Sequence, residues 1–81
     1  MEVTVLLFAA HRELVGAHDM VVSLPDGATV RTLLVELRGR GGNWADLPLH
    51  GAVAVNRKYA DGETVLSDGD EVALIPPVAG G

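Results

Sequence analysis

The chain has 81 residues, which is enough for one domain but leaves no room for a second hydrophobic core. A hydrophobic content of 48% excludes a disordered chain. A net charge of -5, with no basic run longer than Arg57-Lys58, argues against nucleic acid or an anionic membrane surface as a partner. The absence of cysteine excludes disulfides and an internal thiol nucleophile. Since we find no signal-peptide pattern and no apolar stretch of membrane-spanning length, we expect a cytoplasmic protein.

Two strands are expected in the first third of the chain. Residues 2–8 are β-rich, and residues 19–24 form a second run that stops at the Pro-Asp-Gly turn signal of residues 25–27. About ten residues separate the runs, which predicts a hairpin with a wide loop. Alternation along the first strand gives one face with Val3, Val5 and Leu7 and a second face with Thr4, Leu6 and Phe8.

An amphipathic helix is expected next. Thr29 is a suitable N-cap, because its hydroxyl can accept a hydrogen bond from one of the first free backbone N–H groups. Glycines at positions 39, 41 and 42 end the helix. The i, i+3, i+4, i+7 spacing predicts one apolar stripe, formed by Val30, Leu33, Leu34 and Leu37.

The second half of the chain predicts two further strands. Residues 52–56 form one, which is followed by a turn at Asn56-Arg57-Lys58. Asp61-Gly62 and Asp68-Gly69 mark a short irregular stretch, and residues 70–75 form the last strand, which ends at Pro76-Pro77. Because a helix must bury its stripe against a sheet, this order predicts an α+β domain with a mixed sheet packed on one main helix, typical of the β-grasp or ubiquitin-like fold. The first and last strands of that fold lie parallel at the sheet centre. We expect the domain to span residues 1–77 and a flexible tail residues 78–81.

No self-contained active site is visible in the sequence. His11, His18 and His50 lack the spacing of metal ligands, and we expect exposed or locally hydrogen-bonded histidines. The glycine-rich stretch 39–43 lacks the Lys-Ser/Thr of a phosphate-binding loop, so it is interpreted as a helix terminator. The acidic turn at residues 68–71 is interpreted as solvated, with docking to a basic partner as the alternative.

The C-terminal tail has a composition suited to a narrow site. Pro76-Pro77 favours a stiff, extended exit, and the side chains then shrink from Val78 through Ala79 to Gly80-Gly81. Four extended residues reach about 13 Å. Because glycine lacks a Cβ, a Gly-Gly end lets a partner approach closely and leaves the terminal carboxylate unhindered. The alternative is a frayed terminus without function.

An apolar surface is expected at the root of this tail. If the face of the first strand that carries Val5 packs on the helix, Leu6 and Phe8 lie on the opposite face. The same parity turns Ala73 and Ile75 outward in the last strand. Parallel strands then place Phe8 near Ile75, at the end from which the tail leaves. Such an exposed patch is typical of a docking surface, and the alternative is a second, smaller core under the loops.

Four pieces of the sequence are similar to one known family. They are Leu7-Phe8-Ala9 followed by Arg12-Glu13-Leu14-Val15-Gly16, then Ala54-Val55-Asn56, the Leu-Ser-Asp-Gly-Asp-Glu-Val run at 66–72, and the ending Pro-Pro-Val-Ala-Gly-Gly. Over essentially its whole length the chain resembles the small subunit of molybdopterin synthase, the MoaD family. The ending is the most specific piece.

The resemblance implies a sulfur carrier that is not an enzyme on its own and binds no cofactor or metal itself. In the family, a ubiquitin-activating-like adenylyltransferase uses ATP to adenylate the terminal carboxylate, here that of Gly81, and a sulfur donor converts it to a thiocarboxylate. The tail, residues 78–81, enters the large subunit and donates sulfur to the cyclic pyranopterin precursor, building the dithiolene that binds molybdenum. The family assembles as a heterotetramer of two small and two large subunits. By position, the contacts with the large subunit are Phe8, Tyr59, Ile75, Pro76 and Pro77.

Three rival functions stay open. The thiamin-pathway sulfur carrier has the same fold and tail chemistry, but its members usually begin with a shorter first strand and lack the Arg-Glu-Leu stretch. A ubiquitin-like protein modifier joins the same activated glycine to lysines. A plain interaction module has an inert tail. The chain also departs from the MoaD family at two of these contact positions. Tyr59 stands where an aliphatic residue is expected, and Ile75 stands where an aromatic residue is expected.

Overall fold

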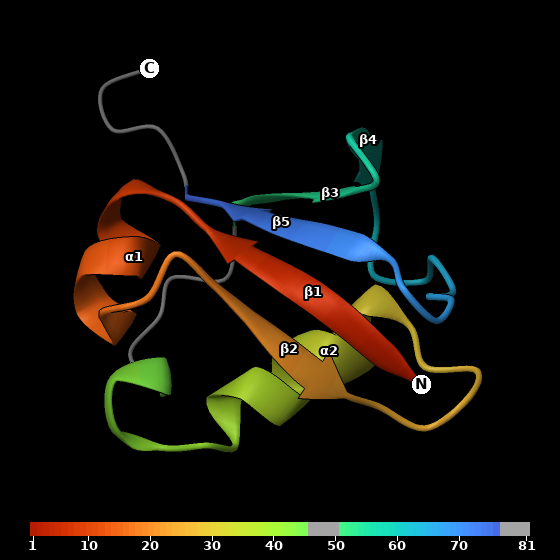
Figure 1. Ribbon diagram of the computed structural model, residues 1–81, viewed down its shortest axis with the longest axis horizontal. Helices are drawn as coiled ribbons and strands as arrows, with labels where there is room; N and C mark the ends of the chain where they lie inside the picture. Colours follow the sequence, from red (N-terminus) through yellow and green to blue (C-terminus); the bar gives the residue numbers. More distant parts are fainter. Residues whose placement is uncertain (46–50, 77–81) are drawn as a thin grey trace.

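One mixed sheet organises the structure. The computed structural model describes residues 1–45 and 51–76, and within them five strands form a sheet in the order β2-β1-β5-β3-β4. The longer helix, α2, crosses one face of this sheet, and the short helix α1 lies at the end where β1 finishes (Figure 1). The elements in chain order are β1 (Glu2–Leu7), α1 (Ala9–Val15), β2 (Asp19–Ser23), α2 (Val30–Arg38), the 3-10 turn η1 (Gly42–Trp44), β3 (Ala52–Val55), β4 (Lys58–Ala60) and β5 (Glu71–Ile75).

The centre of the sheet is the parallel pair of β1 and β5. Val5 lies opposite Val72, and Leu7 lies opposite Leu74. On one side β2 pairs antiparallel with β1, and on the other β3 pairs antiparallel with β5 and carries β4 at the edge. The predicted α+β, β-grasp arrangement with parallel first and last strands is confirmed.

A single apolar cluster, among the described residues, fills the space between the sheet and α2. The alternate residues of β1 and β5 that were predicted to face the helix are at most 2% exposed. The predicted stripe of α2 is buried at Val30, Leu33 and Leu37 and half-buried at Leu34. Because a fully buried Val or Leu stabilises by about 1.5–3 kcal/mol, this cluster is the main source of stability.

Thr29 begins α2 as predicted. Its Oγ1 accepts a hydrogen bond from the backbone N–H of Thr32 at 3.2 Å, and its own N–H donates to Thr32 Oγ1 at 3.1 Å. This reciprocal capping box satisfies two backbone donors at the helix start. The helix ends at Arg38, with Gly39 as C-cap, which confirms the predicted terminator.

The connection between β1 and β2 corrects the sequence-based expectation. The two strands pair as predicted, but the wide loop between them contains α1. The helix can pack because Leu14 and Val15 follow His11 at i+3 and i+4, which places all three on its inner side. It ends at Gly16, whose φ of 80° suits glycine. The sequence does not signal this stripe, because its most buried member is a histidine.

A second correction concerns β4, a strand that was not predicted and that begins at Lys58, within the turn predicted at Asn56-Arg57-Lys58. Asn56 and Arg57 form the turn from β3, with φ of 50° and 72° in the left-handed region that two-residue hairpin turns require. The Asn56 side chain is held at both ends. Its Nδ2 donates to Asp70 Oδ1 at 2.9 Å, and its Oδ1 accepts from the Glu71 N–H at 3.0 Å. These bonds tie the hairpin to the start of β5.

The acidic turn before β5 is held by the chain's own backbone. Asp68 Oδ1 accepts from the Glu2 N–H at 2.8 Å, and Asp70 Oδ2 accepts from the Ser67 N–H at 2.8 Å. Asp70 therefore closes the turn, and Asp68 joins the turn to the start of β1. This local closure fixes the point at which β5 enters the sheet beside β1.

Two substitutions of Asn56 separate the contribution of its side-chain hydrogen bonds from that of its left-handed backbone. We expect Asn56→Ala to lower the free energy of unfolding by about 2 kcal/mol, because two side-chain hydrogen bonds are lost and alanine is strained at positive φ. Asn56→Gly loses the same bonds without the strain, so it should be less destabilising by about 1 kcal/mol. Chemical denaturation of the wild type and both variants measures this order. Equal losses in the two variants would show that the left-handed backbone contributes nothing.

Candidate functional site

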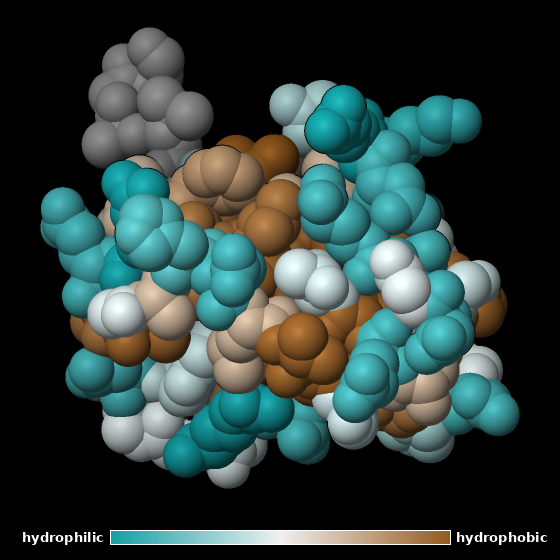
Figure 2. Space-filling model, in the orientation of Figure 1, coloured by the Kyte–Doolittle hydropathy of each residue, from teal (hydrophilic) through white to brown (hydrophobic). Residues whose placement is uncertain are grey.

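The sheet face opposite α2 carries an apolar surface, which we call the outer face. Strand pairing sets Leu6 beside Ala73, Ala73 beside Ala54, and Ala54 beside Tyr59, so one row of side chains crosses four strands. Figure 2 looks onto this face, where apolar residues occupy the middle and polar residues surround them. The two residues in the centre of the row, Ala73 and Ala54, are alanines, so this part of the face carries only short side chains.

A second row lies one step nearer the end of β5. Ile75 pairs with Ala52, and the Leu7–Leu74 pair places Phe8 and Ile75 at the next position of the two central strands. Phe8 keeps extended backbone angles (φ -126°, ψ 153°) before the chain turns into α1. The phenylalanine side chain is 44% exposed, whereas Ile75 and Pro76 are half-buried. An exposed aromatic ring therefore lies at the root of the C-terminal tail.

The site residues predicted from the sequence fall into three groups. Phe8, Ile75 and Pro76 lie together where β5 ends. Tyr59 lies on the same face but at the edge strand β4, where it is 82% exposed. The predicted residues Pro77, Val78, Ala79, Gly80 and Gly81 lie outside the described residues.

A second core under the outer face does not form within the described residues. Except for Ala54, which lies on the outer face and is 8% exposed, the buried apolar side chains there gather in one cluster on the α2 side of the sheet. On the outer face Leu6, Ala73 and Ile75 are half-buried and Phe8 is exposed. The described residues therefore agree with an apolar surface on the outer face and not with a second core.

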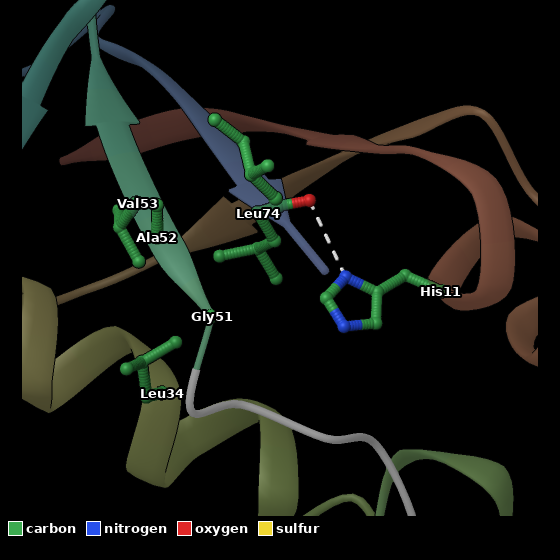
Figure 3. Close-up of a pocket in the computed structure, with 7 residues that line it drawn as sticks. His11, Leu34, Gly51, Ala52, Val53 and Leu74 are labelled. Carbon is green, nitrogen blue, oxygen red and sulfur yellow. Dashed lines mark hydrogen bonds between the residues drawn. The ribbon is translucent and has the colours of Figure 1, made fainter. Parts of the chain in front are cut away.

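The histidine prediction is wrong for His11. This side chain is 1% exposed, and its Nδ1 lies 3.3 Å from the carbonyl oxygen of Leu74, a residue distant in sequence (Figure 3). His18 is exposed and receives a hydrogen bond from Arg12 at 3.4 Å, while His50 lies outside the described residues. The imidazole is buried because a strand carbonyl is there to accept its N–H. Only a helical interpretation of residues 9–15 would have pointed to it.

Neither a metal centre nor a membrane helix is found in the part of the chain that the structure describes. No three His, Cys, Asp or Glu side chains come together in residues 1–45 and 51–76 in a way that could hold an ion. None of the helices there is both long and apolar enough to cross a membrane. What these residues offer is a docking face beside the end of a strand.

The fold and this face define a ubiquitin-like β-grasp protein whose last strand ends beside an exposed apolar surface. Residues 5–81 match the ThiS family. The chain belongs to the ThiS family.

Curated relatives resemble the chain over its full length. The molybdopterin synthase sulfur carrier subunit of Escherichia coli is 40% identical over 81 residues, covering 98% of this chain and 99% of the relative. The subunit of the same name from Arabidopsis thaliana is 35% identical over 81 residues, covering 100% of this chain and 84% of the relative. The small archaeal modifier protein 3 of Haloferax volcanii is 37% identical over 92 residues, covering both chains completely.

Solved structures agree with the fold. The crystal structure of SAMP1 from Haloferax volcanii superposes with a TM-score of 0.84 at 29% identity, covering 100% of both chains. A chain in the complex of subunits 1 and 2 of molybdopterin-converting factor from Helicobacter pylori gives a TM-score of 0.71 at 26% identity, also over the whole of both chains. In that complex, a chain of this fold binds a second subunit.

Proposed function

We propose that this chain is the sulfur carrier subunit of a molybdopterin synthase, with Gly81 as the residue that carries the sulfur. The observation that carries the proposal is the full-length similarity to sulfur carrier subunits from a bacterium and a plant. The uncovered apolar face beside the end of β5 supports it, because a carrier must be recognised by its partners. On this proposal the reacting carboxylate is that of Gly81, and glycine, which has no Cβ, would leave it unhindered.

The proposed chemistry takes place on the terminal carboxylate. A carboxylate is a poor electrophile, so an adenylyltransferase first joins it to AMP from ATP, with pyrophosphate as the leaving group. A sulfur donor at the oxidation level of sulfide then attacks the carbonyl carbon, and AMP leaves to give the thiocarboxylate. Two loaded chains each transfer one sulfur to the cyclic pyranopterin precursor to build the dithiolene, and the carboxylate of each chain is restored with oxygen that comes from water or the precursor. The chain has no cysteine, so the sulfur comes from another molecule.

On this proposal the chain has no catalytic activity or resident cofactor of its own. ATP is bound by the activating enzyme, and the pterin precursor by the large subunit. The described residues contribute a fold that presents the tail and a face that docks. The compartment we propose is the cytoplasm, where ATP is available to the activating enzyme.

The proposed main partner is the large subunit of molybdopterin synthase, in an assembly of two small and two large subunits. The Helicobacter pylori complex supports pairing with a second subunit. The contacts we propose are Phe8, Ile75 and Pro76 at the root of the tail, Tyr59 at the edge of the same face, and Pro77 beyond them. A net charge of -5 favours encounter with basic surfaces on the partner proteins.

A second candidate function is protein modification. It is favoured by the 37% identity to a small archaeal modifier protein over the full length of both chains. Attack of a lysine amine on the acyl-adenylate would release AMP and form an isopeptide bond. The two functions share the activation step and differ in the nucleophile that follows.

Intact-mass measurement tests the proposal. The chain is incubated with the adenylyltransferase, ATP and a sulfide-level sulfur source, and we expect a mass gain equal to the exchange of one oxygen for one sulfur. Omission of ATP is the control, since a free carboxylate does not react. No gain with an activating enzyme that loads a known carrier would refute the carrier function. Conjugates with added lysine-containing protein, in the absence of any sulfur gain, would favour the modifier.

A further inference from the structure

Among the described residues, His11 is the one buried polar or charged side chain, and the sulfur-carrier proposal gives it no role. It lies on α1, which begins two residues after β1 ends. Burial of an imidazole is unfavourable unless its N–H groups are hydrogen-bonded. The hydrogen bond from Nδ1 reaches back across the fold to the Leu74 carbonyl at 3.3 Å.

The position of that carbonyl gives the contact its significance. The register between β1 and β5 stops at the Leu7–Leu74 pair, because the chain leaves the sheet after Leu7 and turns into α1. On its other side β5 stays paired for one more residue, at Ile75 with Ala52. His11 therefore forms a hydrogen bond to β5 at the last residue of β5 that pairs with β1. Only Ile75 remains of the strand after this point.

Among the described residues, the side chains that line a pocket with His11 are apolar and belong mainly to three elements. With Leu34 of α2 and Ala52 of β3, His11 and Ile75 line one small pocket of about 160 Å³, counting the part that is open to solvent. Figure 3 shows the imidazole directed at the Leu74 carbonyl, with Leu34 on α2 below the strands. The hydrogen bond from His11 to the Leu74 carbonyl is stronger next to apolar side chains than in water. A substitution that removes the donor leaves the Leu74 carbonyl without this hydrogen bond.

We infer that His11 is a positioning residue that anchors the end of β5 and so fixes where the C-terminal tail departs. The inference rests on the proposed function, because the departure point matters only if the tail must enter a partner's site. Six extended residues from Pro76 to Gly81 reach about 20 Å, so a strand end that frays by two residues lengthens the free segment by about a third. A longer free segment lowers the effective concentration of the terminal carboxylate at a docked site. It does not alter the chemistry once the carboxylate is bound.

The test compares His11→Leu with His11→Asn. Leucine fills apolar space but donates no hydrogen bond, whereas the Asn Nδ2 can take the place of the imidazole Nδ1, since both follow Cγ. We expect His11→Leu to lower kcat/KM for adenylation by the activating enzyme about three- to tenfold, chiefly through KM, which corresponds to about 0.7–1.4 kcal/mol. His11→Asn should recover most of the loss. Should His11→Leu not fold, His11→Met gives the same comparison with another side chain that has no donor.

Amide hydrogen exchange separates positioning from stability. In His11→Leu, the amides of Leu74 and Ile75 should exchange about tenfold faster while that of Val5 is unchanged. Val22→Ala is the matched control, because it removes buried volume at the opposite end of the sheet, and it should lower stability without changing KM. Unchanged exchange at Leu74 and Ile75, or a KM that rises equally in Val22→Ala, would overturn the inference. If the wild-type chain is never adenylated, the proposed function is wrong, and with it the role of His11 in directing the tail. The exchange rates of Leu74 and Ile75 would still show whether His11 anchors the end of β5.

Discussion

Deletion of Gly81 is expected to lower sulfur loading at least about 100-fold. The shortened chain still ends in a glycine carboxylate, that of Gly80, so the reacting group is chemically the same. Its position changes, because each extended residue contributes about 3.5 Å of reach. A misplacement of about 1 Å can already cost about 100-fold in a reaction that depends on alignment. Intact-mass spectrometry after incubation with the activating enzyme, ATP and the sulfur source measures the loss.

Addition of one alanine after Gly81 is the companion experiment. It lengthens the chain by the same distance and adds a Cβ beside the reacting carboxylate, so loading should again be lost. Thermal denaturation is the control for both variants, and the midpoints should match the wild type because β5 ends at Ile75, before the altered residues. If either variant accepts sulfur at the wild-type rate, loading does not depend on the position of the Gly81 carboxylate, and the assignment of Gly81 as the acceptor is wrong.

The fold could be predicted from the sequence because its strongest signals are local and periodic. The alternation in β1 and β5 identified the buried face, and Thr29 with the stripe that follows identified α2. The order of those elements is typical of the β-grasp fold, and the parallel central pair was expected because that fold contains one. The placement of Phe8 beside Ile75 depends only on the same parity and register. This part of the candidate site could therefore be predicted from the sequence.

The missed features depend on contacts between distant residues. His11 looks like a surface residue in the sequence, and only the carbonyl of Leu74, brought alongside by the fold, makes its burial possible. β4 is three residues long and depends on a left-handed turn at Asn56 and Arg57, which non-glycine residues rarely adopt. The position of Tyr59 on the outer face follows from β4 and could not be derived before it. Long-range hydrogen bonds leave no periodic trace in a sequence.

Substitution of Phe8 by aspartate is expected to weaken binding to the molybdopterin synthase large subunit at least about 100-fold, or about 2.7 kcal/mol. The wild-type ring is 44% exposed, so it has surface left to bury against a partner. The variant loses that apolar contact and brings an unpaired carboxylate into the interface, where desolvation opposes it. Isothermal titration calorimetry of the purified subunits measures the change in Kd.

Val21→Asp provides the matched control for Phe8→Asp. Val21 lies on the same outer face and is 60% exposed, but it pairs with Thr4 in the middle of β1, away from Phe8. The same charge is added to the same sheet, so a general electrostatic effect would weaken binding equally in both variants. If only Phe8→Asp weakens binding while both variants keep the wild-type unfolding midpoint, the docking surface is at the root of the tail. If Phe8→Asp unfolds, Phe8 belongs to the core and the outer face cannot be read as a docking surface from its exposure alone.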